Sequence, residues 1–212
     1  MKLMNALLAS LTLGLAIAPP TVAADLAEGK QFVRVQMPQP TEVAGKVEVI
    51  EFFWYGCSHC NDFEPLLKLW VKKLPADVHF KKVPAIFRPE WAVGARTFYT
   101  LEALNLLDKI NDKVFNAIHK ERINLNDEKV LFDWIGNQGV DRQKFQDMYK
   151  SFAIDGKVRR AGEMTQEYGF GGVPAMIVGG KYMPAPNVGS YQDLLRVVDG
   201  LIEKTRGELK KK

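Results

Sequence analysis

The chain has 212 residues, of which 47% are apolar. A chain of this length can bury a hydrophobic core that is stable without disulfide bonds. Its formal net charge of +4 is too small to indicate a nucleic-acid-binding protein. It contains only two cysteines, which excludes a small secreted scaffold held together by several disulfides.

The first 23 residues have the pattern of a secretory signal peptide. Lys2 precedes an apolar stretch over residues 6–18, and the small-residue run Thr21–Ala24 follows it. This order is typical of exported proteins, and we expect cleavage after Ala23 or Ala24. A membrane anchor is the alternative, but it would need about 20 uninterrupted apolar residues. The sequence therefore predicts a periplasmic protein, in a compartment where disulfides persist.

Strand and helix patterns alternate at the start of the mature chain. Residues 31–36 indicate a short strand, and the near-continuous apolar run Val47–Trp54 predicts a central strand buried on both faces. We expect a helix from Cys57 to about Lys73 and a second core strand over Val78–Ala85. Strand, helix and strand in this order are typical of a βαβ unit with parallel strands.

From about residue 88 to residue 152 the patterns are helical throughout, which predicts a small bundle. Capping residues and apolar spacing indicate four helices. They are Trp91–Leu107, Lys109–Arg122, a helix capped by Asn126 and a helix capped by Asp141.

The last part of the chain returns to mixed structure, with a Gly179-Gly180 dipeptide typical of a tight hairpin turn. We expect the basic ending Lys204–Lys212 to be a frayed, solvated tail. The predicted elements are a helix over about Asp155–Tyr168 ending at Gly169, strands at Ala175–Val178 and Lys181–Met183, and a helix over Ser190–Lys204.

Without the helical block, the order of elements is β-α-β followed by α-β-β-α. This order, with a C-x-x-C motif after the first core strand, predicts an α/β thioredoxin-like fold with an inserted α-helical domain. We expect a signal peptide over 1–23, a thioredoxin-like domain formed by 24–87 and 153–212, and the inserted helical domain over 88–152.

The two cysteines, Cys57 and Cys60, stand three residues apart where a strand gives way to a helix. A structural disulfide over so short a loop would contribute roughly 2 kcal/mol, against about 4.7 kcal/mol for a hundred-residue loop. Structural zinc needs four Cys or His ligands, and His79 and His119 are scattered along the chain. The spacing therefore indicates a redox-active dithiol and no metal.

Cys57 is the expected nucleophile because it opens a helix, where unpaired N–H groups and the helix dipole favour a thiolate. The dipole lowers the pKa by about one unit at most. We expect Ser58 and His59 to support the thiolate, His59 through a hydrogen bond or a positive charge; the alternative is that His59 only faces solvent. Cys60 is the expected buried resolving thiol. A stabilised thiolate makes the disulfide a better oxidant, by roughly 30 mV per pKa unit.

Two further features lie near the cysteines in the predicted fold. Val173-Pro174 follows two glycines and heads a strand, where cis X–Pro bonds occur, although the sequence by itself favours an ordinary trans proline, because most X–Pro bonds are trans. Glu51 lies in the apolar run before the cysteines, and burial there would raise its pKa. It either exchanges a proton with Cys60 or lies at the sheet edge.

These motifs resemble the DsbA family of periplasmic thiol:disulfide interchange proteins of Gram-negative bacteria. The likeness extends over essentially the whole mature chain. It rests on Val49–Phe53, on Cys57–Cys60 followed by Phe63-Glu64, and on Gly172–Met176 followed by Gly180–Tyr182.

The resemblance implies that Val173–Pro174 is a cis bond beside the cysteines, that Glu51 is the buried acid beneath them, and that Tyr182 and Met183 lie by an apolar substrate groove. It also implies reduced, unfolded exported proteins as substrates and the quinone-linked membrane oxidase DsbB as reoxidant. We expect a monomer without a cofactor. The family usually has Pro-His between the cysteines. Because serine does not rigidify the turn, Ser58 predicts a less extreme redox potential.

The leading hypothesis is a dithiol oxidase that donates its disulfide through a mixed-disulfide intermediate. An isomerase or reductase is the second possibility, although isomerases of this superfamily generally add an N-terminal dimerisation domain. A peptide-binding chaperone is the third, since exposed aromatic side chains at Trp54 and Tyr55 would suit peptide binding. They would suit substrate docking by an oxidase equally well, and Trp54 alternatively belongs to the core.

Overall fold

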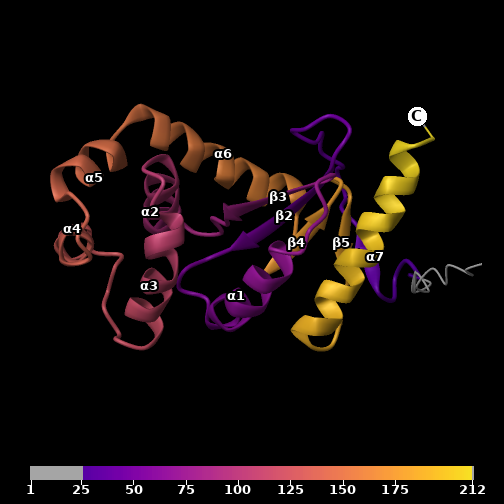
Figure 1. Ribbon diagram of the computed structural model, residues 1–212, viewed down its shortest axis with the longest axis horizontal. Coiled ribbons are helices and arrows are strands. Elements are labelled where there is room, and N and C mark those ends of the chain that lie inside the picture. The colour runs from indigo at the N-terminus through magenta and orange to yellow at the C-terminus, as the bar shows by residue number, and fades with distance from the viewer. Residues whose placement is uncertain (1–25, 212) are drawn as a thin grey trace, which may run out of the picture.

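The structure is built around one fully buried strand, β2, which separates two hydrophobic clusters. In the computed structural model, which describes residues 26–211, five strands form one sheet in the order β1-β5-β4-β2-β3 (Figure 1). β2 pairs in parallel with β3 and antiparallel with β4, which confirms the predicted βαβ unit and hairpin half. The strands are β1 (Phe32–Arg34), β2 (Val47–Phe53), β3 (Val78–Pro84), β4 (Ala175–Val178) and β5 (Tyr182–Pro184).

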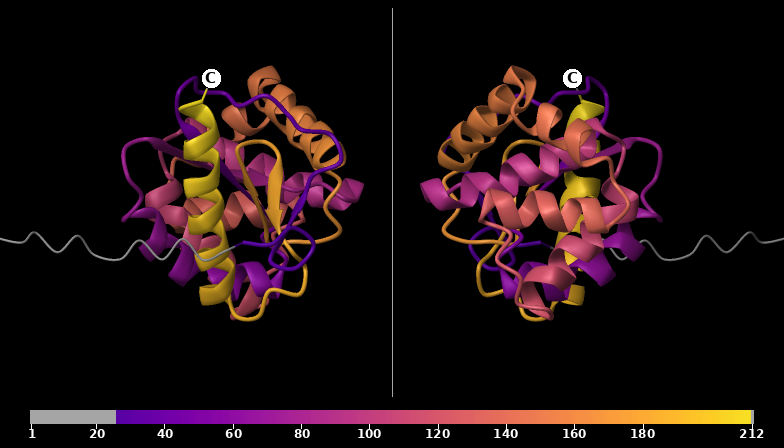
Figure 2. Two further views of the ribbon diagram at one scale, coloured as in Figure 1. Left: turned by 90° about the vertical axis from the view of Figure 1, so that its right-hand side faces the viewer. Right: turned by 90° about the vertical axis from the view of Figure 1, so that its left-hand side faces the viewer.

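Seven α-helices cover the two faces of the sheet in this part of the chain. The left view of Figure 2 shows α7 in front of strands β4 and β5, and α1 packs beside it. The remaining helices lie on the other face and at one end of the sheet (Figure 1). The helices are α1 (Ser58–Val71), α2 (Ala92–Ala103), α3 (Leu107–His119), α4 (Glu128–Asn137), α5 (Arg142–Tyr149), α6 (Phe152–Tyr168) and α7 (Tyr191–Leu209).

Side chains along β2 point alternately to the two faces of the sheet, so its apolar residues are shared between the two clusters. Val47 and Val49 join the cluster beneath α1 and α7, whereas Ile50 and Phe52 join the larger cluster beneath α6 and the inserted helices. The sheet is thus buried on both faces, as the apolar run predicted. The thioredoxin-like α/β fold with an inserted helical domain is confirmed.

Several predicted helix boundaries were wrong, each for a local reason. The helix expected over Trp91–Leu107 ends at Ala103, because Asn105 takes a left-handed φ of 56° and starts a new direction for α3. The N-cap of α4 is Asp127, not Asn126, because the Asp127 carboxylate accepts from two backbone N–H groups. The predicted cap Asp141 and the left-handed Gly169 that ends α6 are confirmed.

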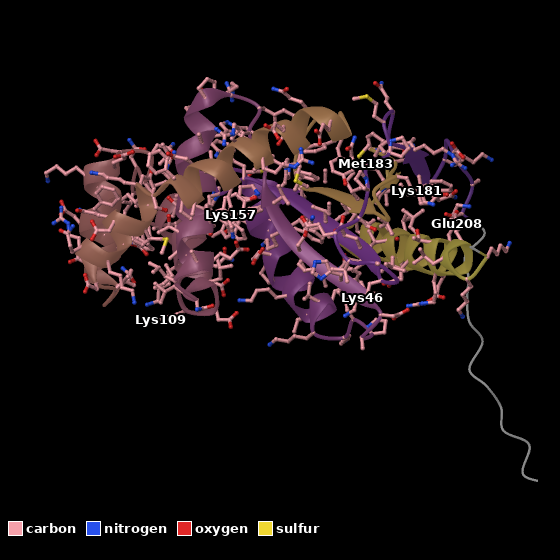
Figure 3. The ribbon with its side chains drawn as sticks, turned by 90° about the horizontal axis from the view of Figure 1, so that it is seen from above. Lys46, Lys109, Lys157, Lys181, Met183 and Glu208 are labelled. Carbon is pink, nitrogen blue, oxygen red and sulfur yellow. The ribbon has the colours of Figure 1, made fainter. Side chains whose placement is uncertain are left out.

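The basic ending was expected to be a frayed tail, and this was wrong for most of its length. α7 continues to Leu209 because its last turns are tied down by ion pairs. Arg206 Nε donates to Asp77 Oδ2 at 2.6 Å, and Lys181 pairs with Glu208 beside the end of the helix (Figure 3). Long-range charge pairing of this kind leaves no periodic signal in the sequence.

The predicted signal peptide, with its cleavage point, lies outside the described residues. Between residues 26 and 211, no helix combines the length and the apolar character that crossing a bilayer requires. The domain boundaries after residues 87 and 152 remain a proposal. The nearest observed breaks are the short 3-10 helix Pro89–Trp91 and Ser151, the N-cap of α6.

The turn between β4 and β5 gives a test of the fold. Gly179 and Gly180 both have positive φ, and a Cβ on Gly180 would lie 2.1 Å from the carbonyl oxygen of Gln39. We expect Gly180→Ala to lower the free energy of unfolding by about 2–3 kcal/mol, because backbone strain and a backbone clash add.

Urea unfolding measures this loss, and Gly45→Ala is the matched control. Gly45 has a φ of 76° with nothing within 4 Å of the added Cβ, so it reports the strain alone, about 1 kcal/mol. Equal losses in the two variants would contradict the close approach of Gln39 to the turn.

Candidate active site

The first cysteine occupies the position between strand and helix that the sequence predicted. Cys57, separated from β2 by Trp54, Tyr55 and Gly56, is the N-cap of α1, with extended φ and ψ of −85° and 118°. Its backbone N–H donates to the carbonyl of Trp54 at 3.0 Å, and its own carbonyl accepts from Asn61 at 3.1 Å. The thiol is half-exposed. The pairing of β2 on both sides therefore places a reachable sulfur at the start of a helix.

The surroundings of Cys57 lower its pKa to about 6, mainly because the Cys60 thiol donates a hydrogen bond to its thiolate. Partial burial opposes this effect. The backbone N–H groups of Cys60 and His59 support the thiolate next, and the charge of His59 contributes after them. An acidic Cys57 was predicted, but the helix dipole and His59 were expected to be its chief causes. The leading contribution comes instead from the second cysteine of the motif.

Cys60 has the opposite environment. Its side chain is 0% exposed. Burial, followed by its hydrogen bond to Cys57 and the charge of Glu51, raises its pKa far above the ordinary value. At neutral pH the reduced site therefore holds a thiolate at Cys57 and a thiol at Cys60. The two sulfurs have become chemically distinct.

The residues between the cysteines, Ser58 and His59, are both exposed. The hydroxyl of Tyr191, the first residue of α7, donates to the backbone carbonyl of His59 at 3.0 Å. This bond ties the first turn of α1 to α7, a connection that sequence reasoning did not identify. The His59 side chain lies at the surface, as the alternative expectation had it. Its charge nevertheless contributes to the lowered pKa of Cys57.

The Val173–Pro174 segment lies against the reactive sulfur. The Val173–Pro174 peptide bond is cis, as the resemblance implied. The Cys57 thiol donates to the Val173 carbonyl oxygen at 3.3 Å. Val173 lies 116 positions after Cys57 in the sequence. The fold therefore brings the two predicted parts of the site together.

Beneath the cysteines, Glu51 is 0% exposed and belongs to a buried cluster of charges. Its Oε2 lies 3.1 Å from Lys82 Nζ on β3, and Lys82 also pairs closely with Glu64 of α1. Desolvation raises the pKa of Glu51 to about 7, although Lys82 opposes the shift. Glu51 is on the central strand, which excludes the sheet-edge alternative.

The cluster continues into the inserted helices. Asn111 of α3 donates to Glu64 Oε1 at 2.8 Å and accepts from the Tyr55 hydroxyl at 2.7 Å. His119 Nε2, in the last turn of α3, donates to the Tyr55 carbonyl at 2.7 Å. Tyr55, two residues before Cys57, is therefore held at both its backbone and its phenol by one helix of the insertion.

Trp54 and Tyr55, the two aromatic residues expected to be exposed for docking, differ in their burial. Tyr55 is only 2% exposed, so that expectation was wrong for it. Trp54 is half-buried and stacks on Trp91, with ring centroids 4.1 Å apart and planes 3° apart. A Cβ on Gly56 would lie 2.4 Å from the Trp54 ring. Glycine at this position therefore allows the indole to fold back over the backbone next to Cys57.

Met183 and Tyr182, which the resemblance implied to lie by the substrate groove, lie on opposite faces of the sheet. Met183 is half-buried and borders the same hydrophobic cluster as Cys57 and Val173. Tyr182 is 2% exposed, lies in the other cluster, and donates its hydroxyl to Glu208 at 2.6 Å. Successive residues of a strand point to opposite faces, and Tyr182 points away from the cysteines.

Within residues 26–211, one group of side chains has the spacing of metal ligands, namely Glu42, Glu48 and His79. It lies around the start of β2, whereas the cysteines follow the end of that strand. Lys81 Nζ lies 2.6 Å from Glu42 and 3.3 Å from Glu48, so a lysine already balances these carboxylates.

Comparison with known proteins identifies the family. The family model described as "DSBA-like thioredoxin domain" matches residues 48–196. The chain belongs to the DsbA family. It is 41% identical over 207 residues to the thiol:disulfide interchange protein DsbA of Burkholderia cepacia, an alignment that covers 97% of each chain. The protein of the same name from Pseudomonas aeruginosa is 42% identical and aligns over 90% of its length.

Solved structures of DsbA proteins share the fold. The crystal structure of Pseudomonas aeruginosa DsbA has a TM-score of 0.83 at 42% identity, covering 88% of this chain and 97% of that one. Neisseria meningitidis NmDsbA1 has a TM-score of 0.80 at 31% identity, covering 88% and 97%. As a DsbA-family member, the protein is a thiol:disulfide oxidoreductase, which exchanges disulfides with substrate proteins and needs a partner that reoxidises it.

Sequence reasoning missed four polar residues beneath and beside the DsbA dithiol. Each carries a polar side chain that makes a hydrogen bond or ion pair around the site. Lys82 is a charged residue within the otherwise apolar end of β3, and this was the strongest available signal. The residues are Glu64, Lys82, Asn111 and His119.

The acidity of Cys57 predicts the pH dependence of its alkylation. Only the thiolate reacts, and its fraction is half-maximal at the pKa of about 6. The iodoacetamide rate of the reduced protein should therefore fall about tenfold per pH unit below 6 and level off above 7. Quenched-flow mass spectrometry gives this profile for Cys57, with Cys60 unreactive in the same samples. A midpoint near 8 would contradict the assignment.

The raised pKa of Glu51 predicts a pH-dependent stability. A carboxyl group with a folded pKa of about 7, against 4.5 ordinarily, binds its proton more tightly in the folded state. It therefore stabilises the fold below pH 4.5 and loses this contribution as the pH rises towards 7. Between these limits the loss is at most about 3 kcal/mol.

Glu51→Gln removes this ionisation. The free energy of unfolding of the variant, relative to that of the wild type, should therefore increase from pH 4.5 to 7 and then stay constant. Urea unfolding of the reduced proteins at a series of pH values measures the difference. The exposed Glu121→Gln is the control and should follow the wild-type profile. A constant difference between Glu51→Gln and wild type would rule out a raised pKa at Glu51.

Proposed function

We propose that the protein is a periplasmic dithiol oxidase that donates a Cys57–Cys60 disulfide to reduced, unfolded exported proteins. The observation that carries this proposal is the contrast between the two sulfurs. Cys57 is half-exposed with a pKa of about 6, whereas Cys60 is buried with a raised pKa. A disulfide whose reduced form is stabilised by a thiolate is a good oxidant.

The first step is attack by a substrate thiolate on Cys57 Sγ, since Cys60 is enclosed. The Cys57–Cys60 bond breaks, a substrate–Cys57 disulfide forms, and Cys60 Sγ leaves with the electron pair. In the second step another substrate thiolate attacks the substrate sulfur of this mixed disulfide. Cys57 then leaves as a thiolate, which is favourable because a leaving thiol of lower pKa departs faster. The substrate has lost two electrons and the enzyme has gained them.

Glu51 is proposed to supply the proton that Cys60 needs. The leaving Cys60 sulfur is a strong base in its buried position. The carboxyl group of Glu51, whose charge acts on both cysteines, has a pKa of about 7 and is half protonated near neutrality. Transfer of this proton avoids a thiolate and a carboxylate side by side in the interior. Lys82, which also pairs with Glu64, holds the carboxyl group in place.

Val173, Pro174 and Met183 are proposed to receive the substrate next to Cys57. The Val173 carbonyl oxygen lies 3.3 Å from Cys57 Sγ, and Met183 borders the same hydrophobic cluster with a flexible apolar side chain. We do not include Tyr182 in direct substrate contact, because its side chain is buried and bonded to Glu208.

The partners follow from the redox balance. Each turnover leaves two electrons on the enzyme, so a second protein must remove them, and we propose the quinone-linked membrane oxidase DsbB. We further propose an exported monomer whose signal peptide is 1–23. Ser58 leaves the turn between the cysteines less rigid than the usual proline would, and we propose a less oxidising potential than in members with Pro-His.

A stoichiometric oxidation assay tests the function. The disulfide-form protein, mixed with a reduced unfolded protein, should remove two substrate thiols per enzyme molecule. Cys57→Ser should remove none. Cys60→Ser, incubated with substrate disulfides, should retain the substrate in a mixed disulfide at Cys57, because the resolving thiol is missing. Thiol titration and non-reducing gels measure these outcomes.

The assay also separates the alternatives. A chaperone would bind the substrate without changing its thiol count, and an isomerase would mainly rearrange disulfides that are already present. An active Cys57→Ser variant would refute the assignment of the nucleophile.

A further inference from the structure

A cavity next to the active-site turn is not used by the chemistry described above. It has a volume of about 210 Å³ and lies between the Trp54–Gly56 segment, α2, α3 and the loop that follows α3. Figure 1 shows α2 and α3 side by side at this end of the sheet. Gly56, the residue directly before Cys57, forms part of its wall. The cavity therefore begins one residue from the reactive sulfur.

The lining of this cavity is apolar and uncharged. Trp54, Val114, Ile118 and Ile123 are among its lining residues, and no Asp, Glu, Lys or Arg lines it. The hydroxyl of Thr97 is already bonded to the Val93 carbonyl at 2.8 Å. Three other cavities in residues 26–211 are each lined by several charged side chains. The cavity beside Gly56 is thus suited to an apolar group.

Its size fits a single side chain. An apolar cavity of about 150 Å³ is large enough to bind benzene, so 210 Å³ accommodates one aromatic or branched aliphatic side chain. Ligand sites of this kind are lined mainly by apolar groups with few polar ones. The polar groups here are the amides of Asn124 and Asn126 in the exposed loop after α3.

The walls are held in place before any ligand arrives. Tyr55 is bonded at its carbonyl by His119 and at its phenol by Asn111. Trp54 stacks on Trp91 and lies against Gly94 of α2, where an added Cβ would be 3.7 Å from the indole. A preformed site of this kind needs little ordering on binding, which favours affinity.

The reaction itself supplies the occupant. A substrate joined to Cys57 by a disulfide brings its neighbouring residues to this end of the molecule at high effective concentration. An extended chain covers about 3.3–3.6 Å per residue, so residues within three positions of the substrate cysteine reach about 10 Å from it.

We propose that this cavity is a specificity site that receives one apolar side chain of the substrate polypeptide, from a residue within three positions of the attacking cysteine. The proposal rests on the proposed oxidase function. It makes Ile118, Ile123 and Gly94 residues that select substrates without taking part in the exchange of sulfur bonds.

Matched dithiol peptides test the proposal. Each peptide carries two cysteines in a neutral Gly/Ser background, with Phe or Asp placed in turn at each of the three positions on either side of the first cysteine. At one of these positions the disulfide-form protein should oxidise the Phe peptide at least about tenfold faster than the Asp peptide, a discrimination within the range of hydrophobic pockets. Stopped-flow measurement of second-order rate constants gives the ratio.

Two variants change the cavity in different ways. Ile123→Asn makes it polar, and Gly94→Leu fills it. Both should reduce the Phe-to-Asp ratio to about one. Val130→Asn, a similar apolar-to-polar change at a residue of α4 that is 37% exposed and does not line the cavity, should keep the wild-type ratio. Circular dichroism confirms that each variant is folded.

Glutathione oxidation distinguishes this proposal from the proposed function, because glutathione has no large apolar side chain. All variants should oxidise glutathione at the wild-type rate. A Phe preference that survives in both cavity variants, or no preference in a wild-type protein that oxidises glutathione, would overturn the specificity site. Failure of the wild-type protein to oxidise any thiol would instead overturn the oxidase function.

Discussion

The chemistry of this protein depends on a single local interaction, the stabilisation of a thiolate at the first turn of α1. Burial by itself would raise the pKa of Cys57, because the charged form loses solvent. The Cys60 thiol and the backbone N–H groups of Cys60 and His59 outweigh this effect and bring the pKa to about 6. These donors surround the sulfur because only the short segment Trp54–Gly56 separates the end of β2 from Cys57, the N-cap of α1. The position of the two cysteines at the strand-to-helix turn therefore gives their thiols very different pKa values.

The buried charges beneath the site are not explained by the stability of the fold. Glu51, Lys82 and Glu64 come from β2, β3 and α1 and are largely removed from water. Buried ion pairs of this kind seldom stabilise a protein relative to apolar residues, since desolvation offsets their attraction. Their position is better explained by chemistry. In the proposed reaction they hold a carboxyl group with a pKa of about 7, which supplies the proton that the Cys60 sulfur gains on reduction.

The inserted helices complete the active site and are not merely attached to the thioredoxin-like part. α3 holds Tyr55 through Asn111 and His119, and Trp91, just before α2, stacks on Trp54. The segment that leads into Cys57 is thus fixed by residues from the insertion. Trp54 and Tyr55, which these contacts hold, also line the apolar cavity. The contacts that fix the segment before the reactive cysteine therefore also fix part of the proposed specificity site.

The sequence alone was sufficient for the order of elements, the dithiol and the acidity of its first sulfur. It predicted β4 and the caps Asp141 and Gly169, because strand alternation, helix capping and left-handed glycines depend on neighbours a few residues away. Tertiary structure decided the rest. Lys82 meets Glu64, His119 meets Tyr55, and Arg206 extends α7 by pairing with Asp77, all through contacts 18 to 129 residues apart. Such contacts form only when packed elements bring distant side chains together, so periodicity along the chain carries no record of them.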